Sequence, residues 1–214
     1  MSTALNLLSS VELVFWDFDG VIKDSVDVKT AAFEELFLPY GIDVAARVRA
    51  HHEAHGGVSR FQKMPLYLGW AGVSATPAIV DDHCRRFSGL VLQRVIDAPW
   101  VPGVREYLSA HHGSQRFVLV TATPQAEIEH IVDKLGIAGL FGQVFGAPTK
   151  KAEAIAQVLA ATGTEPRSAL MVGDADTDLA AAVANGVGFL LRRTALNRAL
   201  HDRSGIAMFD DLAS

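Results

Sequence analysis

Four short runs of apolar residues stand out along the chain, and each is bounded by polar or turn-forming residues. They are Leu13–Asp17, Phe117–Thr121, Ala169–Val172 and Val187–Leu191. Continuous apolar runs of this length, without alternation of polar residues, are typical of parallel strands that are buried on both faces. We therefore predict that these four segments form the centre of a parallel sheet.

Amphipathic helices separate the later strands, and start and stop signals accompany them. Thr123 and Pro124 supply a cap and a first-turn residue, and Asn185-Gly186 supplies a C-terminal stop. The alternation of strand and helix predicts an α/β fold, a Rossmann-like doubly wound parallel sheet. The predicted helices are Ala126–Leu135, Ala152–Ala161 and Asp178–Ala184.

The segment between Ser25 and Ala98 interrupts this alternation, because its patterns are helical only. Ser59 and Gln62 fit a capping box, and Thr76-Pro77 opens a long helix. One stripe of that helix carries Val80, Cys84, Phe87, Val91 and Val95. We therefore predict an all-helical cap domain, residues 24–98, inserted into an α/β core formed by residues 1–23 and 99–214.

Composition narrows the class of protein. Half of the 214 residues are hydrophobic, which is enough for a sizeable core. The net charge of −5 gives no general attraction to nucleic acid or to an anionic membrane. With Cys84 as the single cysteine, no signal-peptide pattern and no 20-residue apolar run, we expect a cytoplasmic protein. The oligomeric state stays open, and a monomer is compatible with the sequence.

Paired carboxylates follow the first predicted strand. Asp17 and Asp19 are two residues apart, so an extended backbone would point both to the same side. Two like charges this close need a cation or a proton, and a hard divalent ion such as Mg²⁺ prefers oxygen ligands. An Asp-Gly turn would explain Asp19 but not Asp17.

Further carboxylates follow the third predicted strand. Asp174 and Asp178 are four residues apart and would share one face of a helix that starts at once. Helix capping explains one acid in this segment, and we assign Asp176 to solvent or to the helix dipole. Because ligands bind beyond the carboxyl ends of the strands in open α/β sheets, we expect Asp174 and Asp178 to approach Asp17.

Groups that suit a phosphate occur at the same predicted edge. Thr121 ends a strand just before a helix, where a hydroxyl and backbone N–H groups can hold an anion. Lys150 and Lys151 open a helix, where a cation is unfavourable unless it has an anionic partner. Lys151 lies on the apolar side of that helix, so we prefer Lys151 and keep Lys150 as the alternative.

These motifs together resemble the haloacid dehalogenase superfamily. The matching segments are "DFDGV" (Asp17–Val21), "VTATP" (Val120–Pro124), "GAPTKK" (Gly146–Lys151) and "VGDADTD" (Val172–Asp178). The helical insertion, with "GGVSRF" (Gly56–Phe61), resembles the cap of phosphoglycolate phosphatase and β-phosphoglucomutase relatives. The resemblance covers nearly the whole chain.

The resemblance implies a role for each residue. Asp17 would be the nucleophile that forms an aspartyl phosphate, and Asp19 would be general acid and then general base. Asp17, the Asp19 carbonyl oxygen and Asp174 would coordinate Mg²⁺, with Asp178 in support. Thr121, Lys151 and the backbone N–H of Ala122 would hold the phosphoryl oxygens, although relatives often carry Asn at position 122.

The implied function is a Mg²⁺-dependent phosphatase for a small phosphorylated metabolite, of the sugar-phosphate or phosphoglycolate type. The dehalogenases of the superfamily lack an acid at the position of Asp19, so its presence favours phosphate transfer. A phosphomutase of the β-phosphoglucomutase type is one alternative, and a non-catalytic phospho-acceptor or binding module is another.

Residues of the cap offer candidates for substrate selection. Arg60 stands at a predicted helix start, where it could bind a carboxylate, a sugar hydroxyl or a second phosphate, and Lys23 and Lys63 are weaker candidates. The His51, His52 and His55 cluster lacks the ligand spacing of a metal site, and its role stays open.

Overall fold

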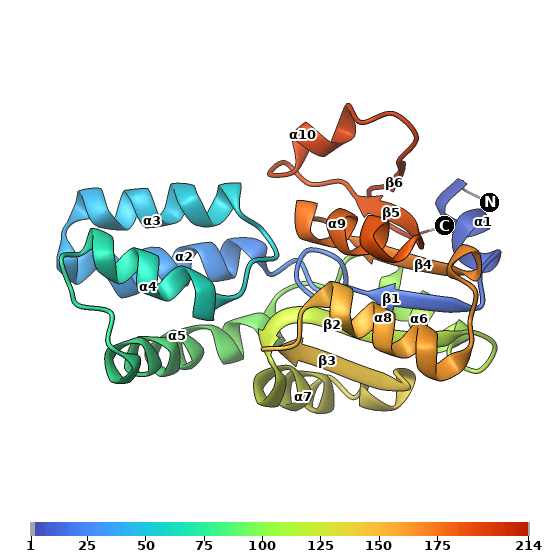
Figure 1. The fold of residues 1–214 in the computed structure, drawn as a ribbon, viewed down its shortest axis with the longest axis horizontal. Coiled ribbons are helices and arrows are strands. Elements are labelled where there is room, and N and C mark those ends of the chain that lie inside the picture. Colours follow the sequence, from blue (N-terminus) through green and yellow to red (C-terminus); the bar gives the residue numbers. More distant parts are fainter. Residues whose placement is uncertain (1–2, 214) are drawn as a thin grey trace.

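A six-stranded parallel sheet forms the centre of the molecule, as the computed structural model shows for the residues it describes, 3–213 (Figure 1). The strand order is β3-β2-β1-β4-β5-β6. The predicted doubly wound α/β class is therefore confirmed. The strands are β1 (Leu13–Trp16), β2 (Arg116–Pro124), β3 (Gln143–Ala147), β4 (Ala169–Gly173), β5 (Gly188–Arg192) and β6 (Ala207–Phe209).

The register of the central strands places three polar residues at the same edge of the sheet. β1 lies between β2 and β4, and Trp16 is opposite both Leu119 and Val172. The next residue, Asp17, donates its N–H to the carbonyl oxygen of Val172 at 2.9 Å. Asp17 and Asp174 directly follow β1 and β4. Thr121 lies inside β2, which continues to Pro124, so the prediction that Thr121 ends a strand is wrong, although all three residues lie at the same edge of the sheet.

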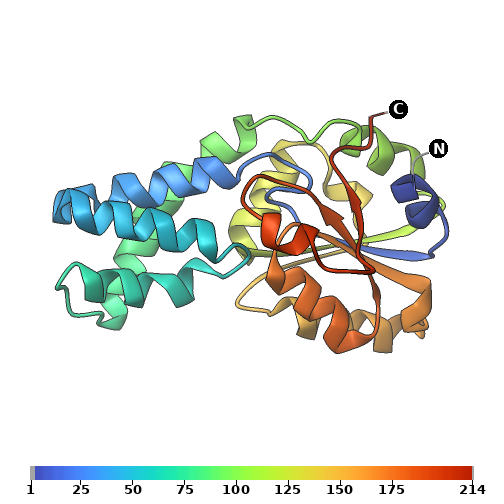
Figure 2. The same cartoon turned by 90° about the horizontal axis from the view of Figure 1, so that it is seen from above.

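Helices cover both faces of the sheet, because alternate residues of each strand point to opposite sides (Figure 2). Leu13 and Phe15 pack with α8 and α9, while Val14 and Trp16 belong to the larger core on the other face. The helices of this α/β unit are α1 (Thr3–Ser9), α6 (Val104–His111), α7 (Gln125–Lys134), α8 (Lys151–Thr162), α9 (Asp176–Asn185) and α10 (Arg198–His201), with short 3₁₀ turns at Ala138–Leu140 and Pro166–Ser168.

Two edge strands, β3 and β6, were not apparent from the sequence. An edge strand has one neighbour and is less buried, so it needs fewer apolar residues than a central strand. β3 begins with exposed Gln143, and β6 is only three residues long. The predicted cap at Thr123 is also corrected, because β2 continues to Pro124 and α7 begins only at Gln125.

The helical insertion lies beyond the carboxyl ends of the strands, at the left of Figure 1. Its core is aromatic, with the rings of Phe33 and Phe87 3.9 Å apart between centroids and Tyr67 packed edge-on against Phe33. Ser59 caps α4 by accepting a hydrogen bond from the N–H of Phe61. The helices are α2 (Val26–Phe37), α3 (Ile42–Ala54), α4 (Arg60–Trp70) and α5 (Pro77–Asp97), with a 3₁₀ turn at Leu38–Tyr40. The domain limits at residues 24 and 98 stay a prediction.

Two chain segments join the insertion to the α/β unit, and Lys23 links them. Its Nζ donates to the carbonyl oxygen of Ile96 at 2.9 Å and lies 4.7 Å from the ring centroid of Trp100. Lys23 is 2% exposed and so occupies a structural position between the two segments.

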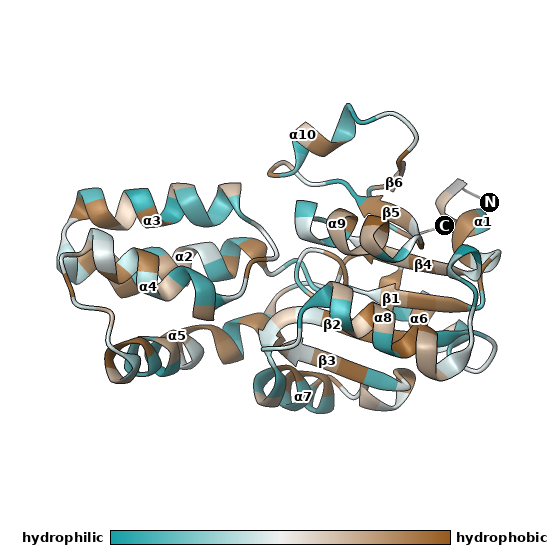
Figure 3. Cartoon of the chain, viewed as in Figure 1, coloured by the Kyte–Doolittle hydropathy of each residue, from teal (hydrophilic) through white to brown (hydrophobic). Residues whose placement is uncertain are grey.

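Apolar residues concentrate along the sheet and inside the insertion, whereas the outer helix faces are largely polar (Figure 3). Within residues 3–213, no helix has the length and apolar character needed to cross a membrane.

Candidate active site

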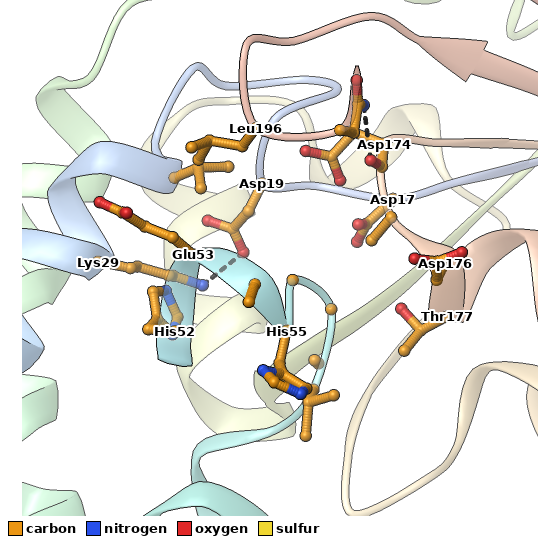
Figure 4. A pocket seen from close by; sticks show the side chains of 18 of the residues that line it. Asp17, Asp19, Lys29, His52, Glu53, His55, Asp174, Asp176, Thr177 and Leu196 are labelled. Atoms are coloured by element: carbon orange, nitrogen blue, oxygen red, sulfur yellow. Dashed lines mark hydrogen bonds and ion pairs between the residues drawn. The ribbon is translucent and has the colours of Figure 1, made fainter. Parts of the chain in front are cut away.

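A pocket of about 470 Å³ lies between the carboxyl edge of the sheet and the helical insertion. One wall is made of strand-end residues, including Asp17, Thr121 and Asp174. The opposite wall comes from α2, α3, α4 and α5 and includes His52 and Arg60. Figure 4 shows the two walls facing one another, with Asp17 and Asp174 on one side and His52 and His55 on the other.

Asp17 is held at the end of β1 with its carboxylate buried. The N–H of Phe18 donates to Asp17 Oδ1 at 2.8 Å, which fixes the side-chain orientation. Burial raises the pKa of Asp17 to about 7; the Lys151 charge lowers it, and the charges of Asp178 and Asp19 raise it further. The Asp17 carboxylate is therefore unusually basic and shielded from water.

Lys151 bridges two of the buried acids. Its Nζ lies 2.8 Å from Asp17 Oδ2 and 2.6 Å from Asp178 Oδ1. Burial opposes the charge on Lys151, but the two carboxylates outweigh burial and raise its pKa above the usual range. Lys150, in contrast, is exposed and pairs with Glu153, so the geometry favours Lys151 as the lysine that reaches the pocket.

Three carboxylates form one cluster that could hold a cation. One oxygen each from Asp17, Asp174 and Asp178 lies within 4.8 Å of the others, and no other such group of three occurs in the described part of the chain. Burial and the neighbouring charges of Asp17 and Asp178 raise the pKa of Asp174 well above its ordinary value. With three ionised acids and one lysine, the cluster would carry a net charge of −2, which a divalent ion would offset.

The donor set fits Mg²⁺, and the acids have unequal positions in it. Asp178 uses Oδ1 for Lys151 and accepts the N–H of Ala175 with Oδ2 at 3.1 Å, so its oxygens are occupied. Asp17 and Asp174 line the pocket, whereas Asp178 does not. A Cβ on Gly20 would lie 2.1 Å from Asp174 Oδ2, so glycine (φ +77°) allows this close approach.

Asp19 lies apart from this cluster and is held by three other side chains. Ser25 Oγ donates to Asp19 Oδ1 at 2.6 Å, Thr123 Oγ1 donates to Oδ2 at 3.2 Å, and Lys29 forms an ion pair with Oδ2. Burial would raise the pKa of Asp19, but Lys29 and the hydroxyl hydrogen bonds outweigh it, so the pKa is lowered. Asp17 and Asp19 thus differ in basicity although they are two residues apart.

Thr121, Ala122 and Arg60 all line the pocket. Thr121 Oγ1 accepts the N–H of Thr123 at 3.2 Å, and its hydroxyl hydrogen is available to a ligand. Arg60 comes from the cap, but its guanidinium makes two bonds to Glu127 of α7, at 2.9 and 2.6 Å. Ser88 Oγ accepts a further bond from Arg60 at 2.6 Å. The ligand roles of these residues stay predictions.

The family model for haloacid dehalogenase-like hydrolases matches residues 11–186, which include every acid of this site. The chain belongs to this family. The resemblance to this family that the sequence indicated is therefore confirmed.

Individual relatives in this family are distant. The phosphoglycolate phosphatase of Pseudomonas putida is 26% identical over 181 residues, and the alignment covers 82% of this chain and 66% of that protein. The chain thus spans slightly less than two thirds of that relative. A solved structure of a predicted phosphoglycolate phosphatase from Haemophilus somnus has a TM-score of 0.71 at 20% identity, covering 95% and 96% of the two chains. A solved structure of a predicted β-phosphoglucomutase from Thermotoga maritima has a TM-score of 0.67 at 20% identity, and the alignment covers 92% of this chain and 94% of that chain.

Several pocket residues of this hydrolase were not found from the sequence. Lys29 and Ser25 follow the first motif, where "KDSVDVK" reads as an ordinary helix start. Asn197 holds the Asp174 loop by donating to the carbonyl oxygens of Asp174 and Arg192 at 2.7 and 2.8 Å. A partly buried lysine ten residues after an acid carries no local signal, because only the turn of the chain between them brings the charges together.

A glycine at position 57 allows the cap of this hydrolase to approach the core closely. A Cβ on Gly57, whose φ is +71°, would lie 1.9 Å from Thr177 Oγ1. We expect Gly57→Ala to lower kcat/KM by about 10-fold, since about 1–2 kcal/mol of backbone strain and the clash would disfavour closure. Gly69→Ala in α4 is the matched control, because nothing lies within 4 Å of that position. Equal steady-state kinetics for both variants would show that this contact is irrelevant to turnover.

Proposed function

We propose that this chain is a Mg²⁺-dependent phosphatase that hydrolyses a small phosphorylated metabolite through an aspartyl-phosphate intermediate. One observation carries the proposal: the basic carboxylate of Asp17 faces the pocket beside Asp174 and Lys151, while Asp19 is held separately by Lys29. The arrangement supplies an oxygen nucleophile, positive charge for phosphoryl oxygens and a separate proton carrier. The names of the phosphoglycolate phosphatase relatives support this substrate class.

In the first step, an oxygen of Asp17 attacks phosphorus and the ester oxygen of the substrate leaves. Asp19 gives that oxygen a proton, which requires Asp19 to exchange its Lys29 partner for a proton beforehand. In the second step, water attacks the phosphorus of the phosphoaspartate and Asp19 accepts a proton from that water. The bond between the Asp17 oxygen and phosphorus breaks, so inorganic phosphate leaves and the Asp17 carboxylate is restored. The lowered pKa of Asp19 suits this second role, because the carboxylate is already ionised.

The remaining residues align and neutralise the phosphoryl group. Asp17, Asp174 and the Asp19 carbonyl oxygen would hold Mg²⁺, with Asp178 fixing Lys151 beside them. When bound, the ion would neutralise charge on the phosphoryl oxygens. Thr121 and Lys151 would donate to the same oxygens, and the Ala122 N–H would add a backbone donor.

The test is release of inorganic phosphate from a panel of sugar phosphates and 2-phosphoglycolate, with Mg²⁺ and after its removal by chelation. We expect steady release that needs Mg²⁺, because three clustered carboxylates repel the phosphate dianion when no cation is present. Isomerised sugar phosphate without phosphate release would identify a mutase. No turnover of any ester would reject the enzyme and favour a phospho-acceptor or binding module.

A further inference from the structure

Lys63 of α4 is a buried lysine without an acidic partner. Its side chain contacts His52 of α3, and the distance from Lys63 Nζ to His52 Nδ1 is 2.9 Å. Lys63 is 2% exposed and His52 is 9% exposed. Across residues 3–213, no carboxylate forms an ion pair with Lys63. Within the described residues, the cap therefore holds a basic pair that has no carboxylate partner.

The other buried or partly buried basic groups considered around the pocket have carboxylate partners. Lys151 pairs with Asp17 and Asp178, Lys29 pairs with Asp19, and Arg60 pairs with Glu127. Burial and the nearby charge of Lys29 lower the pKa of Lys63 to about 7. A cation kept from water without a counter-charge is unstable, so an anion that entered here would be strongly favoured.

His52 connects this pair to the pocket. It lines the cavity, and Figure 4 shows its ring beside Lys29 and below Asp19. Phe33 packs against the ring with centroids 4.8 Å apart, which limits its rotation. When Lys63 donates to Nδ1, the imidazole must carry its hydrogen on Nε2. Nε2–H is then the donor available to a ligand.

Arg60, the cap residue that the sequence indicated as a candidate, is less suited to binding an anion of the substrate in the observed arrangement. Both terminal nitrogens of its guanidinium bond to Glu127, and its charge is already offset. His52 and Lys63 have no such partner, so the cap-side position for an anion falls to them.

We propose that His52, oriented by Lys63, binds a second anionic group of the substrate, a carboxylate or a second phosphate. This inference rests on the proposed phosphatase function and specifies its substrate class: phosphate monoesters that carry another negative charge remote from the transferred phosphoryl group. His52 contacts that group, and Lys63 is a positioning residue that acts through His52.

The experiment compares two esters that differ only at the remote end, 2-phosphoglycolate and ethylene glycol monophosphate. The Asp17→Asn variant is used for binding because it should not hydrolyse the esters. In calorimetry we expect it to bind 2-phosphoglycolate about 10- to 100-fold more tightly than ethylene glycol monophosphate, as for a charge-assisted hydrogen bond. Lys63→Met and His52→Gln, each added to Asp17→Asn, should reduce this preference to less than about 3-fold. In the active chain, the same two changes should raise KM for the carboxylate ester more than they lower kcat.

Matched controls use exposed residues of the same types. Lys134→Met and His112→Gln remove a lysine and a histidine from the surface and should retain the preference. Circular dichroism melting checks that each variant folds, and Lys63→Gln provides a second, polar replacement if Lys63→Met does not. A parallel pair, glucose 6-phosphate and glucose 1,6-bisphosphate, distinguishes a carboxylate from a second phosphate as the anion.

The proposal would be overturned if, in both pairs, the ester with a second anionic group bound no more tightly than the ester without one. It would also be overturned if the preference for the second anionic group survived in both Lys63 variants and in His52→Gln. Binding of neither ester would overturn it as well. Failure of the proposed phosphatase function would give a different result. The Asp17→Asn chain would still prefer the ester with the second anionic group, but the active chain with Mg²⁺ would release no phosphate from any ester.

Discussion

Asp17→Asn is expected to lower phosphate release by at least about 10⁴-fold, because the amide has no carboxylate oxygen to attack phosphorus. The fold should persist. Burial raises the pKa of Asp17 to about 7, well above that of the carboxyl in an unfolded chain, so ionised Asp17 destabilises the metal-free fold at neutral pH. The asparagine variant should therefore unfold at the same or a higher temperature without Mg²⁺.

A matched control variant distinguishes the loss of the attacking carboxylate from the mere loss of one negative charge. Asp176 is exposed at the start of α9 and pairs with Arg203, so Asp176→Asn removes one acid from the same edge without changing Asp17. Its phosphate release should stay within about 2-fold of the original chain, as for ordinary surface substitutions. Substantial activity in homogeneous Asp17→Asn protein, verified by mass spectrometry, would exclude the covalent route.

Lys151→Met should lower kcat by about 10²–10³-fold, the usual effect of removing one preorganised charge from a phosphoryl or oxyanion site. It should also destabilise the metal-free fold by about 3–5 kcal/mol, because Asp17 and Asp178 would lose their shared buried partner. Added Mg²⁺ would offset part of the unpaired negative charge of these buried carboxylates. The loss of stability should therefore be smaller with the ion than without it.

Chemical denaturation with and without Mg²⁺ measures both effects, alongside steady-state kinetics. Lys150→Met is the matched control, since Lys150 is exposed and pairs only with Glu153 at 3.8 Å. It should change stability by less than about 1 kcal/mol. A loss of activity confined to Lys150→Met would reverse the assignment of the two lysines.

The central sheet could be predicted because its strands are marked by their own composition. β1, β2, β4 and β5 are continuous apolar runs, and burial on both faces requires that pattern whatever the rest of the chain does. The edge strands β3 and β6 were missed, because a strand with one neighbour and partial exposure has no such requirement.

The nucleophile candidate and the metal acids could also be expected from the sequence, since like charges at strand ends have few structural explanations. Asp17, Asp174 and Asp178 do gather within 4.8 Å. Arg60 shows the limit of that reasoning. Its position in the pocket was foreseen, but its partner Glu127 lies 67 residues away on a helix of the core.

By itself, the sequence determined the α/β class, the helical insertion and the acids of the candidate site, because each depends on local composition and on the parallel direction of the strands. Only the tertiary structure decided which charges neutralise one another. It paired Asp19 with Lys29 and Lys151 with two acids, and it left Lys63 beside His52 without a carboxylate. Ionic interactions between buried groups depend on distances of a few ångströms, and these are set by how the cap packs on the sheet rather than by spacing along the chain.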